Sequence, residues 1–323
     1  MTRADHYAPS QSAEQSYESM KGFIAELEKR SRFSTGIDVH GVTRFEREGE
    51  VYALETVRSK SERENKRAAK EIHAYLLSVF DKEEVDDKDS IRHQIERGIV
   101  SYGIIRNDQG AIISLMGTQV ADVPQSRQHD QALCVWYVVT SDEQQGKGLA
   151  LELYRNAYTN ALESVQQKGV LLSAIVGEAV SEVEGYLNKM GRKRPYFTDG
   201  NGNLCEIPFP QAPIGAETVG IEPPQEHCMV RFLDDRHSCS VEDMLALIKT
   251  VFAQYVDPRY DCLYDAPSEI ESVKSATRKT YRDIKRRITA SGTSEILLLD
   301  AKQRAAMEQE LQRQGKQLIE INA

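Results

Sequence analysis

The chain has 323 residues, of which 40% are hydrophobic and 28% charged, and its formal net charge is −9. This composition is ordinary for a globular protein of one large or two average domains, and the negative charge argues against a general nucleic-acid binder. The five cysteines form no CxxC pair, which argues against a zinc ribbon or a disulfide framework and favours a reducing, cytoplasmic compartment. No secretory signal is visible, and the apolar runs are far shorter than a membrane span.

The first half of the chain predicts alternating helices and strands after a disordered polar tail at residues 1–17. Hydrophobic periodicity and turn residues delimit the elements. They are a helix at 18–30, a strand at 51–57, a helix at 61–80, a helix at 89–97 capped by Asp89 or Ser90, and strands at 101–106, 111–123 and 132–139.

The second half continues this alternation up to residue 233 and then changes. The expected elements are a helix at 147–168, a strand at 170–176, a helix at 182–190, strands at 195–197 and 204–207, a proline-rich excursion at 207–224 and a strand at 228–233. Beyond them the pattern predicts a helix that starts near Ser240, a helix at 268–290 and a final strand, helix and strand at 295–300, 301–314 and 317–321. The final β-α-β unit either extends a sheet or forms a small satellite lobe.

A glycine-bearing turn at residues 145–150 lies between the strand at 132–139 and the helix at 147–168. The first N–H groups of a helix have no intrahelical partner, and the helix dipole adds positive charge there. Gly146 and Gly148 let the backbone approach a bulky anion. The spacing is neither that of a Walker loop nor that of a dinucleotide fingerprint, because Leu149 and Leu151 stand where those motifs need other residues.

The turn matches the pattern Gln/Arg-x-x-Gly-x-Gly/Ala through Gln145, Gly148 and Ala150. In this pattern, and in the order of elements over residues 48–233, the chain resembles the GNAT superfamily of N-acyltransferases. The resemblance implies an α/β fold with a mixed sheet, a GNAT-like domain at 18–235 and an additional C-terminal α/β extension at 236–323.

The resemblance also implies a binding site for acetyl-CoA or another acyl-CoA as co-substrate, with no metal. The pyrophosphate would lie on the backbone of Gln145, Gly146, Lys147, Gly148, Leu149 and Ala150. The pantetheine arm would pair with the strand through Val138 and Val139, and an N–H group near Val138 would polarise the thioester carbonyl. A plain strand-to-helix turn is the alternative interpretation of the loop, and the Lys147 side chain is expected to be solvated.

The catalytic groups that the resemblance implies are only partly present. The family's proton-donating tyrosine corresponds to Leu187, and Tyr186 stands one residue away. We therefore predict Tyr186 as the group that protonates the CoA thiolate, with packing under the sheet as the alternative. Ala132 occupies the position of the glutamate base of histone-type members. Asp122, His129 and Asp130 lie nearby, and each is expected to be a solvated loop or strand-end residue.

Two other groups of residues invite a functional and a structural interpretation. The helix at 268–290 carries a basic face that is expected to be solvated or paired with the acidic residues 83–87, and nucleic acid or the CoA 3′-phosphate is the less favoured partner. His227, Cys228, His237 and Cys239 are close in sequence, but adjacent strand residues point to opposite faces, so a four-ligand zinc site is not expected.

The sequence therefore predicts an N-acyltransferase that moves an acetyl or other short acyl group directly from CoA to an amine. The acceptor is expected to be a small or amino-acid-like molecule rather than a protein. The alternative is a non-catalytic GNAT-fold protein that senses CoA or serves as an interaction scaffold. No membrane partner is expected, and the choice between monomer and homodimer is left open.

Overall fold

The computed structural model describes residues 11–30, 34–39, 42–47, 49–124, 130–179, 181–208, 227–256, 261 and 267–320. Within them the strands form two sheets, one of eight and one of five strands. The larger sheet contains, in spatial order, β1 (Ser34–Val39), β2 (Val42–Arg47), β3 (Glu50–Val57), β4 (Ser101–Arg106), β5 (Ile112–Asp122), β6 (Gln131–Thr140), β7 (Leu172–Ala179) and β10 (His227–Phe232). The smaller sheet contains β11 (Ser238–Ser240), β12 (Glu295–Leu299), β8 (Arg194–Thr198), β9 (Leu204–Glu206) and β13 (Leu318–Ile319).

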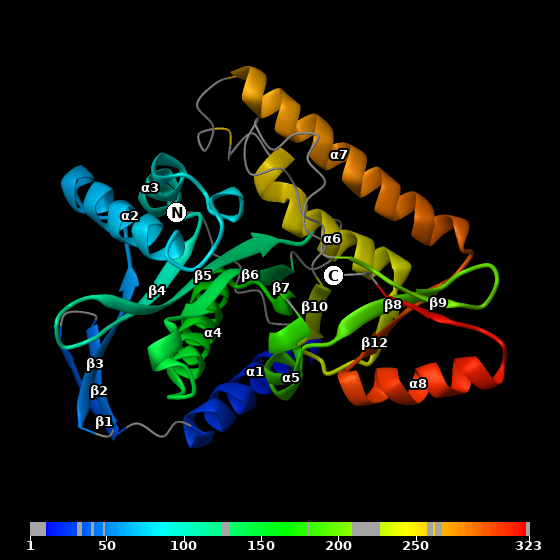
Figure 1. Cartoon of the computed structure of the whole chain (residues 1–323), viewed down its shortest axis with the longest axis horizontal. Helices are drawn as coiled ribbons and strands as arrows, with labels where there is room; N and C mark the ends of the chain where they lie inside the picture. Colours follow the sequence, from blue (N-terminus) through cyan, green and yellow to red (C-terminus); the bar gives the residue numbers. More distant parts are fainter. Residues whose placement is uncertain are drawn as a thin grey trace, which may run out of the picture.

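Helices cover both faces of the larger sheet. The described α-helices are α1 (Gln11–Arg30), α2 (Glu62–Leu76), α3 (Lys88–Arg97), α4 (Leu149–Lys168), α5 (Ser181–Lys189), α6 (Val241–Val256), α7 (Pro267–Ala290) and α8 (Ala301–Arg313). Figure 1 shows α4 and α1 together on one side of the larger sheet, with α2, α3, α6 and α7 on the other. Apolar cores fill both interfaces. Leu153 of α4 and Ile175 of β7 lie in the core on the α1–α4 side, and Ile72 of α2, Ile91 of α3 and Ile248 of α6 lie in the cores on the other side.

The larger sheet divides between β6 and β7. These two strands pair in parallel only from Gln131↔Leu172 to Val135↔Gly177. Beyond that point β6 stays paired with β5 as far as Thr140, while β7 stays paired with β10 as far as Ala179. A bulge at Trp136, which has no opposite residue on β5, accompanies the separation because a bulge bends the strand that carries it. The two halves of the sheet therefore diverge at the carboxyl ends of β6 and β7.

The C-terminal residues join the smaller sheet rather than forming a separate lobe. β12 pairs antiparallel with β8, and β13 pairs parallel with β9. One apolar core combines Val230 of β10 with Ile248 of α6 and Ile296 of β12. Strand pairing and packing thus cross the boundary expected at 235/236, and the division into domains remains a prediction.

The element order predicted from the resemblance is confirmed over residues 50–232. One strand, two helices, three strands, a helix, a strand, a helix and further strands follow one another, so the chain has a mixed α/β fold in the expected order with an additional C-terminal part.

The local predictions need five corrections. α1 begins at Gln11, so residues 11–17 are helical and not a disordered tail, while residues 1–10 lie outside the described residues. The N-cap of α3 is Asp87, whose carboxylate accepts hydrogen bonds from the N–H groups of Asp89 and Ser90. The strands β1 and β2 were not predicted from the sequence, and neither was β11.

Candidate acyl-CoA site

The glycine-bearing turn joins β6 to α4 as expected. A 3₁₀ turn, η2 (Asp142–Gln144), leads into it, and α4 starts at Leu149 with Gly148 as its N-cap. Gly146 and Gly148 have φ angles of 75° and 83°. These left-handed conformations are unfavourable for residues with a Cβ, which explains why glycine stands at both positions.

The backbone N–H groups at the start of α4 are available to a ligand. Among the residues that the structure describes, none accepts a hydrogen bond from the N–H groups of residues 146–150. Gly146 is exposed and Gly148 is half-buried, so the turn is open to solvent. No side chain caps α4, in contrast to the capping box of Ser61 and Glu64 on α2. The turn therefore presents a row of donors at the positive end of a 20-residue helix.

The polar side chains of the turn are engaged with neighbouring residues. Lys147 Nζ lies 2.6 Å from Glu50 Oε2, and this pairing holds the pKa of Lys147 above its usual value. Gln145 Nε2 donates to Asp142 Oδ1 at 2.9 Å. Arg47 donates to the carbonyl of Lys147. Among the described groups of the turn, the backbone N–H groups are thus the ones left free to bind an anion.

The divergence of β6 from β7 exposes the backbone of one of the two predicted valines. The Ser141 N–H donates to the Ile113 carbonyl at 3.0 Å, so Ser141 faces β5. Alternate residues of an antiparallel strand face the same neighbour, so Val139 also bonds towards β5 and Val138 turns its N–H and C=O away from it. No residue in the described part of the chain takes up the backbone groups of Val138. Val138, rather than Val139, presents free backbone in the split.

Tyr186 lies on α5 beside α4. Its ring centroid is 6.1 Å from that of Tyr154, and its side chain is 38% exposed. Burial of the hydroxyl end raises the pKa of Tyr186 above its usual value, so the phenol stays protonated at neutral pH. Leu187, the residue in the family's tyrosine position, is buried in the core under α4. The one-residue shift therefore leaves a partly exposed tyrosine next to the α4 layer.

The carboxyl group of Asp86, which the sequence analysis did not single out as a base, lies on the face of β6 opposite to α4. Asp86 precedes α3, and its backbone N–H donates to the hydroxyl of Tyr137 at 3.2 Å. Its Oδ2 accepts from Gln94 Nε2 at 2.8 Å. Desolvation by the surrounding side chains raises the pKa of the Asp86 carboxyl, and the Gln94 hydrogen bond offsets this only in part. Asp86 is thus a general-base candidate beside the residue that precedes Val138.

Asp122 and Asp130, named from the sequence as residues near the position of the base, make hydrogen bonds that join strand ends. Asp122 Oδ1 accepts from Gln131 Nε2 at 2.7 Å and so joins the ends of β5 and β6. The backbone carbonyl of Asp130 accepts from Val123 N–H at 2.7 Å. Ala132 is fully buried, and His129 lies outside the described residues.

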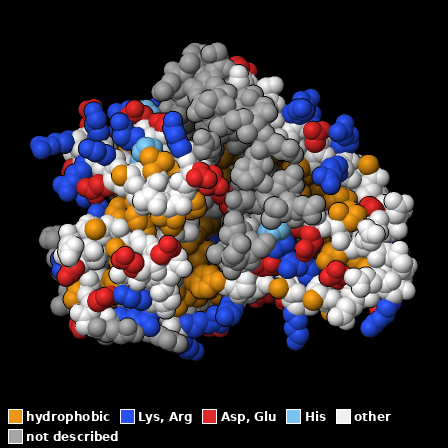
Figure 2. Space-filling view, in the orientation of Figure 1, with side chains coloured by type: hydrophobic (Ala, Val, Ile, Leu, Met, Phe, Trp, Pro, Cys, Tyr) orange, Lys and Arg blue, Asp and Glu red, His pale blue; other side chains and the backbone are white. Residues whose placement is uncertain are grey.

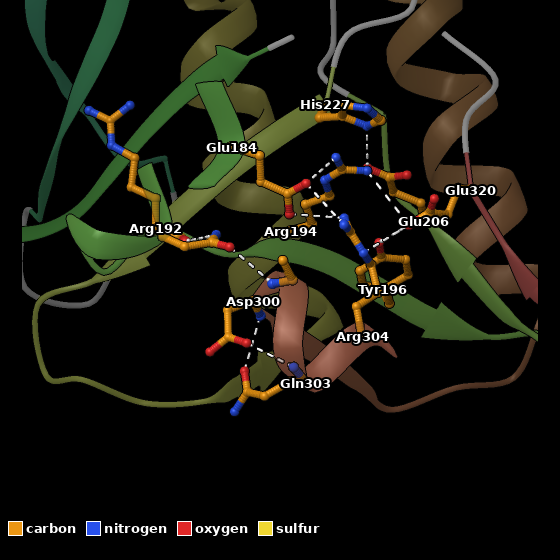
Figure 3. A network of polar contacts seen from close by, with 12 residues as sticks. Glu184, Arg192, Arg194, Tyr196, Glu206, His227, Asp300, Gln303, Arg304 and Glu320 are labelled. Atoms are coloured by element: carbon orange, nitrogen blue, oxygen red, sulfur yellow. Dashed lines mark hydrogen bonds and ion pairs between the residues drawn. The ribbon is translucent and has the colours of Figure 1, made fainter. Parts of the chain in front are cut away.

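A buried network of charged residues lies where α5, α8 and the smaller sheet meet (Figure 3). Arg194 Nη2 donates to Glu184, and its Nη1 lies 3.5 Å from Glu206 Oε1. Glu206 also contacts His227 Nδ1 at 2.8 Å, and Arg304 Nη1 lies 2.9 Å from Glu184 Oε1. The network ties α5, which carries Tyr186, to the C-terminal helix α8.

Two other groups named from the sequence are the His and Cys residues at 227–239 and the basic face of α7. His227 and Cys228 are both buried, and the described residues contain no cluster of three or more His, Cys, Asp or Glu side chains that could hold a metal ion. Lys274 of α7 is buried and pairs with Asp261 at 2.7 Å. The other six cations of this helix are exposed, and Figure 2 shows Lys and Arg side chains along it. None of the described helices has the length and apolar character needed to cross a bilayer.

No protein-family model and no curated protein matches the chain. Solved structures do match part of it. One is NAA60 from Arabidopsis thaliana with a bisubstrate analogue, at 6% identity over 56% of this chain and 97% of that chain, with a TM-score of 0.37. Another is the GNAT family N-acetyltransferase YhbS from Escherichia coli in complex with CoA, at 15% identity over 56% and 81% of the two chains, with a TM-score of 0.33.

A third similar structure is the GCN5-related glucosamine N-acetyltransferase region of a fungal multi-domain GH3 β-N-acetylglucosaminidase. It is 18% identical over 45% of this chain, with a TM-score of 0.34, and the match spans 18% of that longer protein. The second of these structures is a GNAT family N-acetyltransferase, and the third contains a GCN5-related N-acetyltransferase region.

Proposed function

We propose that this chain, which has the element order and strand pairing of the GNAT fold, is an acyl-CoA-dependent N-acyltransferase. The observation that carries the proposal is the combination of free N–H groups at the start of α4 with the free backbone of Val138 in the split between β6 and β7. A diphosphate fits the first, and an extended amide-bearing arm fits the second by adding to a strand edge.

The proposed reaction forms a carbon–nitrogen bond, breaks a carbon–sulfur bond and transfers two protons. The acceptor amine attacks the thioester carbon, and the Val138 N–H stabilises the oxyanion that develops. The carbon–sulfur bond then breaks, and its electron pair leaves with sulfur. Asp86 takes the amine proton through a water, and Tyr186 supplies a proton to the thiolate. The products are an amide and free CoA, and solvent restores both protonation states.

The proposed acceptor is a small or amino-acid-like amine, and the proposed donor carries a short acyl chain such as acetyl. Asp86 and Tyr137 belong to the α2–α3 face of the larger sheet, whereas α4 lies on the other face. We therefore infer that acceptor and CoA approach the thioester from opposite faces.

The proposal is tested by the release of free CoA thiol. Acetyl-CoA should first raise the melting temperature, since ligand at one hundred times its Kd adds about 2.7 kcal/mol to stability. A panel of amines should then release thiol above the rate without amine. Binding without amine-dependent release would favour the non-catalytic CoA sensor, and absence of binding by any acyl-CoA would remove both functions.

The anion-binding role of the turn makes a charge-specific prediction at Gly146. An added Cβ there meets no atom within 4 Å, and Asn and Asp both tolerate its positive φ angle. Gly146→Asp should weaken CoA binding roughly ten- to hundredfold, because a charge about 5 Å from a phosphate contributes about 1–3 kcal/mol at intermediate dielectric constants. The loss should shrink at high salt.

The matched control for this change is Gly146→Asn, which has the same shape and backbone strain without the charge. Titration calorimetry should find its CoA affinity within about threefold of the parent, a difference below 1 kcal/mol. Equal affinities of the Asp and Asn variants would mean that no phosphate lies near the turn.

A further inference from the structure

A buried cation with no carboxylate partner among the described residues lies where β6 and β7 separate, with tyrosines of α4 beside it. Arg192 follows α5 and is 1% exposed. Its guanidinium lies 5.1 Å from the ring centroid of Tyr154 on α4. Its Nη1 is so close to Gly177 that a Cβ built there would lie 3.1 Å away. Gly177 is the last residue of β7 that pairs with β6, so Arg192 marks the closed end of the split.

One edge of this guanidinium is unsatisfied. Nε and Nη2 of Arg192 are buried and have no hydrogen-bond partner among the described residues. These two nitrogens share the edge on which a guanidinium binds a carboxylate through two parallel hydrogen bonds. Figure 3 shows the side chain turned away from the neighbouring network of Glu184 and Arg194. A buried charge that meets tyrosines but no carboxylate among the described residues is costly, so the site favours an incoming anion.

The surroundings indicate from which side the anion comes. Tyr154 and Tyr158 of α4 are fully buried near Arg192, whereas Tyr186 is 38% exposed. Entry past Tyr186 would therefore open the site at the face where α4 and its anion-binding turn lie. In the proposed function this is the CoA face, and the acceptor lies on the other one.

We propose that Arg192 binds a carboxylate at the far end of the acyl group, so that the donor is a dicarboxylic acyl-CoA of the succinyl or glutaryl type. The proposal rests on the function proposed above. Val135, opposite Gly177, lies three residues or about 10 Å along β6 from Val138. That reach is longer than an acetyl group and suits a chain of several carbons that ends in an acid.

The test compares acyl chains of equal length with and without the carboxylate. Titration calorimetry on the full chain would use CoA, butyryl-CoA and succinyl-CoA, then pentanoyl-CoA and glutaryl-CoA. We expect at least one dicarboxylic thioester to bind at least tenfold more tightly than its neutral counterpart. Equal affinities within both pairs would overturn the assignment of Arg192, whereas absence of binding by every CoA compound would instead overturn the proposed function.

The variant Arg192→Met removes the charge and keeps an unbranched, shorter side chain. It should abolish the difference between succinyl- and butyryl-CoA and leave butyryl-CoA affinity within about threefold. If the variant does not fold, the comparison of thioesters on the parent chain still decides.

A second arm separates the two sources of a carboxylate. Free glutamate, succinate and glycine would be titrated into the parent chain saturated with CoA and into Arg192→Met. We expect no binding of these free acids that depends on Arg192. Binding that requires Arg192, with equal affinities for the paired thioesters, would assign the carboxylate to the acceptor and contradict the proposal.

Discussion

Arg194→Met is expected to lower the free energy of unfolding by about 3–5 kcal/mol. The side chain of Arg194 is 2% exposed, and it is the only described residue that contacts Glu184, Glu206 and Glu320 together. Its removal leaves two buried carboxylates with fewer partners, which costs far more than the pairing itself contributes. Urea unfolding followed by circular dichroism would measure the loss.

Two controls make this result specific to burial. Arg286→Met breaks an exposed pair with Asp283 on α7 and should change stability by less than about 0.5 kcal/mol. The combination of Arg194→Met with Glu184→Gln and Glu206→Gln should recover part of the loss, since it removes the stranded charges. A loss below about 1 kcal/mol for Arg194→Met alone would mean that the network does not support α5.

Asp86→Asn is expected to lower kcat about a hundredfold at neutral pH and to leave the affinity for acyl-CoA unchanged. A positioned general base contributes typically about 10²–10⁴-fold, and Asn keeps the shape of Asp but cannot accept a proton. In the parent chain, activity should fall as the pH drops through the raised pKa of Asp86. Initial rates of thiol release from pH 5 to 9 would measure both effects.

The direction in which Asp86→Asn changes the stability of the fold also follows from the pKa of Asp86. Because the pKa of Asp86 is raised in the folded state, its contribution to stability is fully present only below its unfolded pKa and is lost as the pH rises through the folded value. At neutral pH the ionised carboxylate therefore costs stability, and Asp86→Asn should unfold at the same or a higher denaturant concentration. Full activity in this variant would exclude Asp86 as the base.

The sequence predicted the fold well because local patterns determine most of it. Gly146 and Gly148 mark the turn, and the apolar run at 132–139 and the helix after it have clear periodicities. The prediction failed where the pattern is short or polar. β11 has three residues, and the partly buried β2 contains three charged residues in six.

The missing parts of the site depend on contacts between distant residues. Arg192 and Arg194 belong to a run of basic residues that suggests a solvated surface, yet both are buried while Lys193 lies between them. Arg192 and Arg194 are two residues apart, so they would point to the same side of an extended chain, and this spacing could have identified them as a buried pair. The approach of Asp86 to Tyr137 spans 51 residues and required the packing of α3 against the sheet.

Hydrogen exchange with and without a bound acyl-CoA tests the central claim most directly, because it reports on the backbone N–H groups themselves. The predicted result is slower exchange at residues 146–150 and at 138, with no change in β10, which is paired with β7 along its length. Binding that leaves residues 146–150 unprotected would contradict the proposed site, because the diphosphate would then lie elsewhere on the molecule.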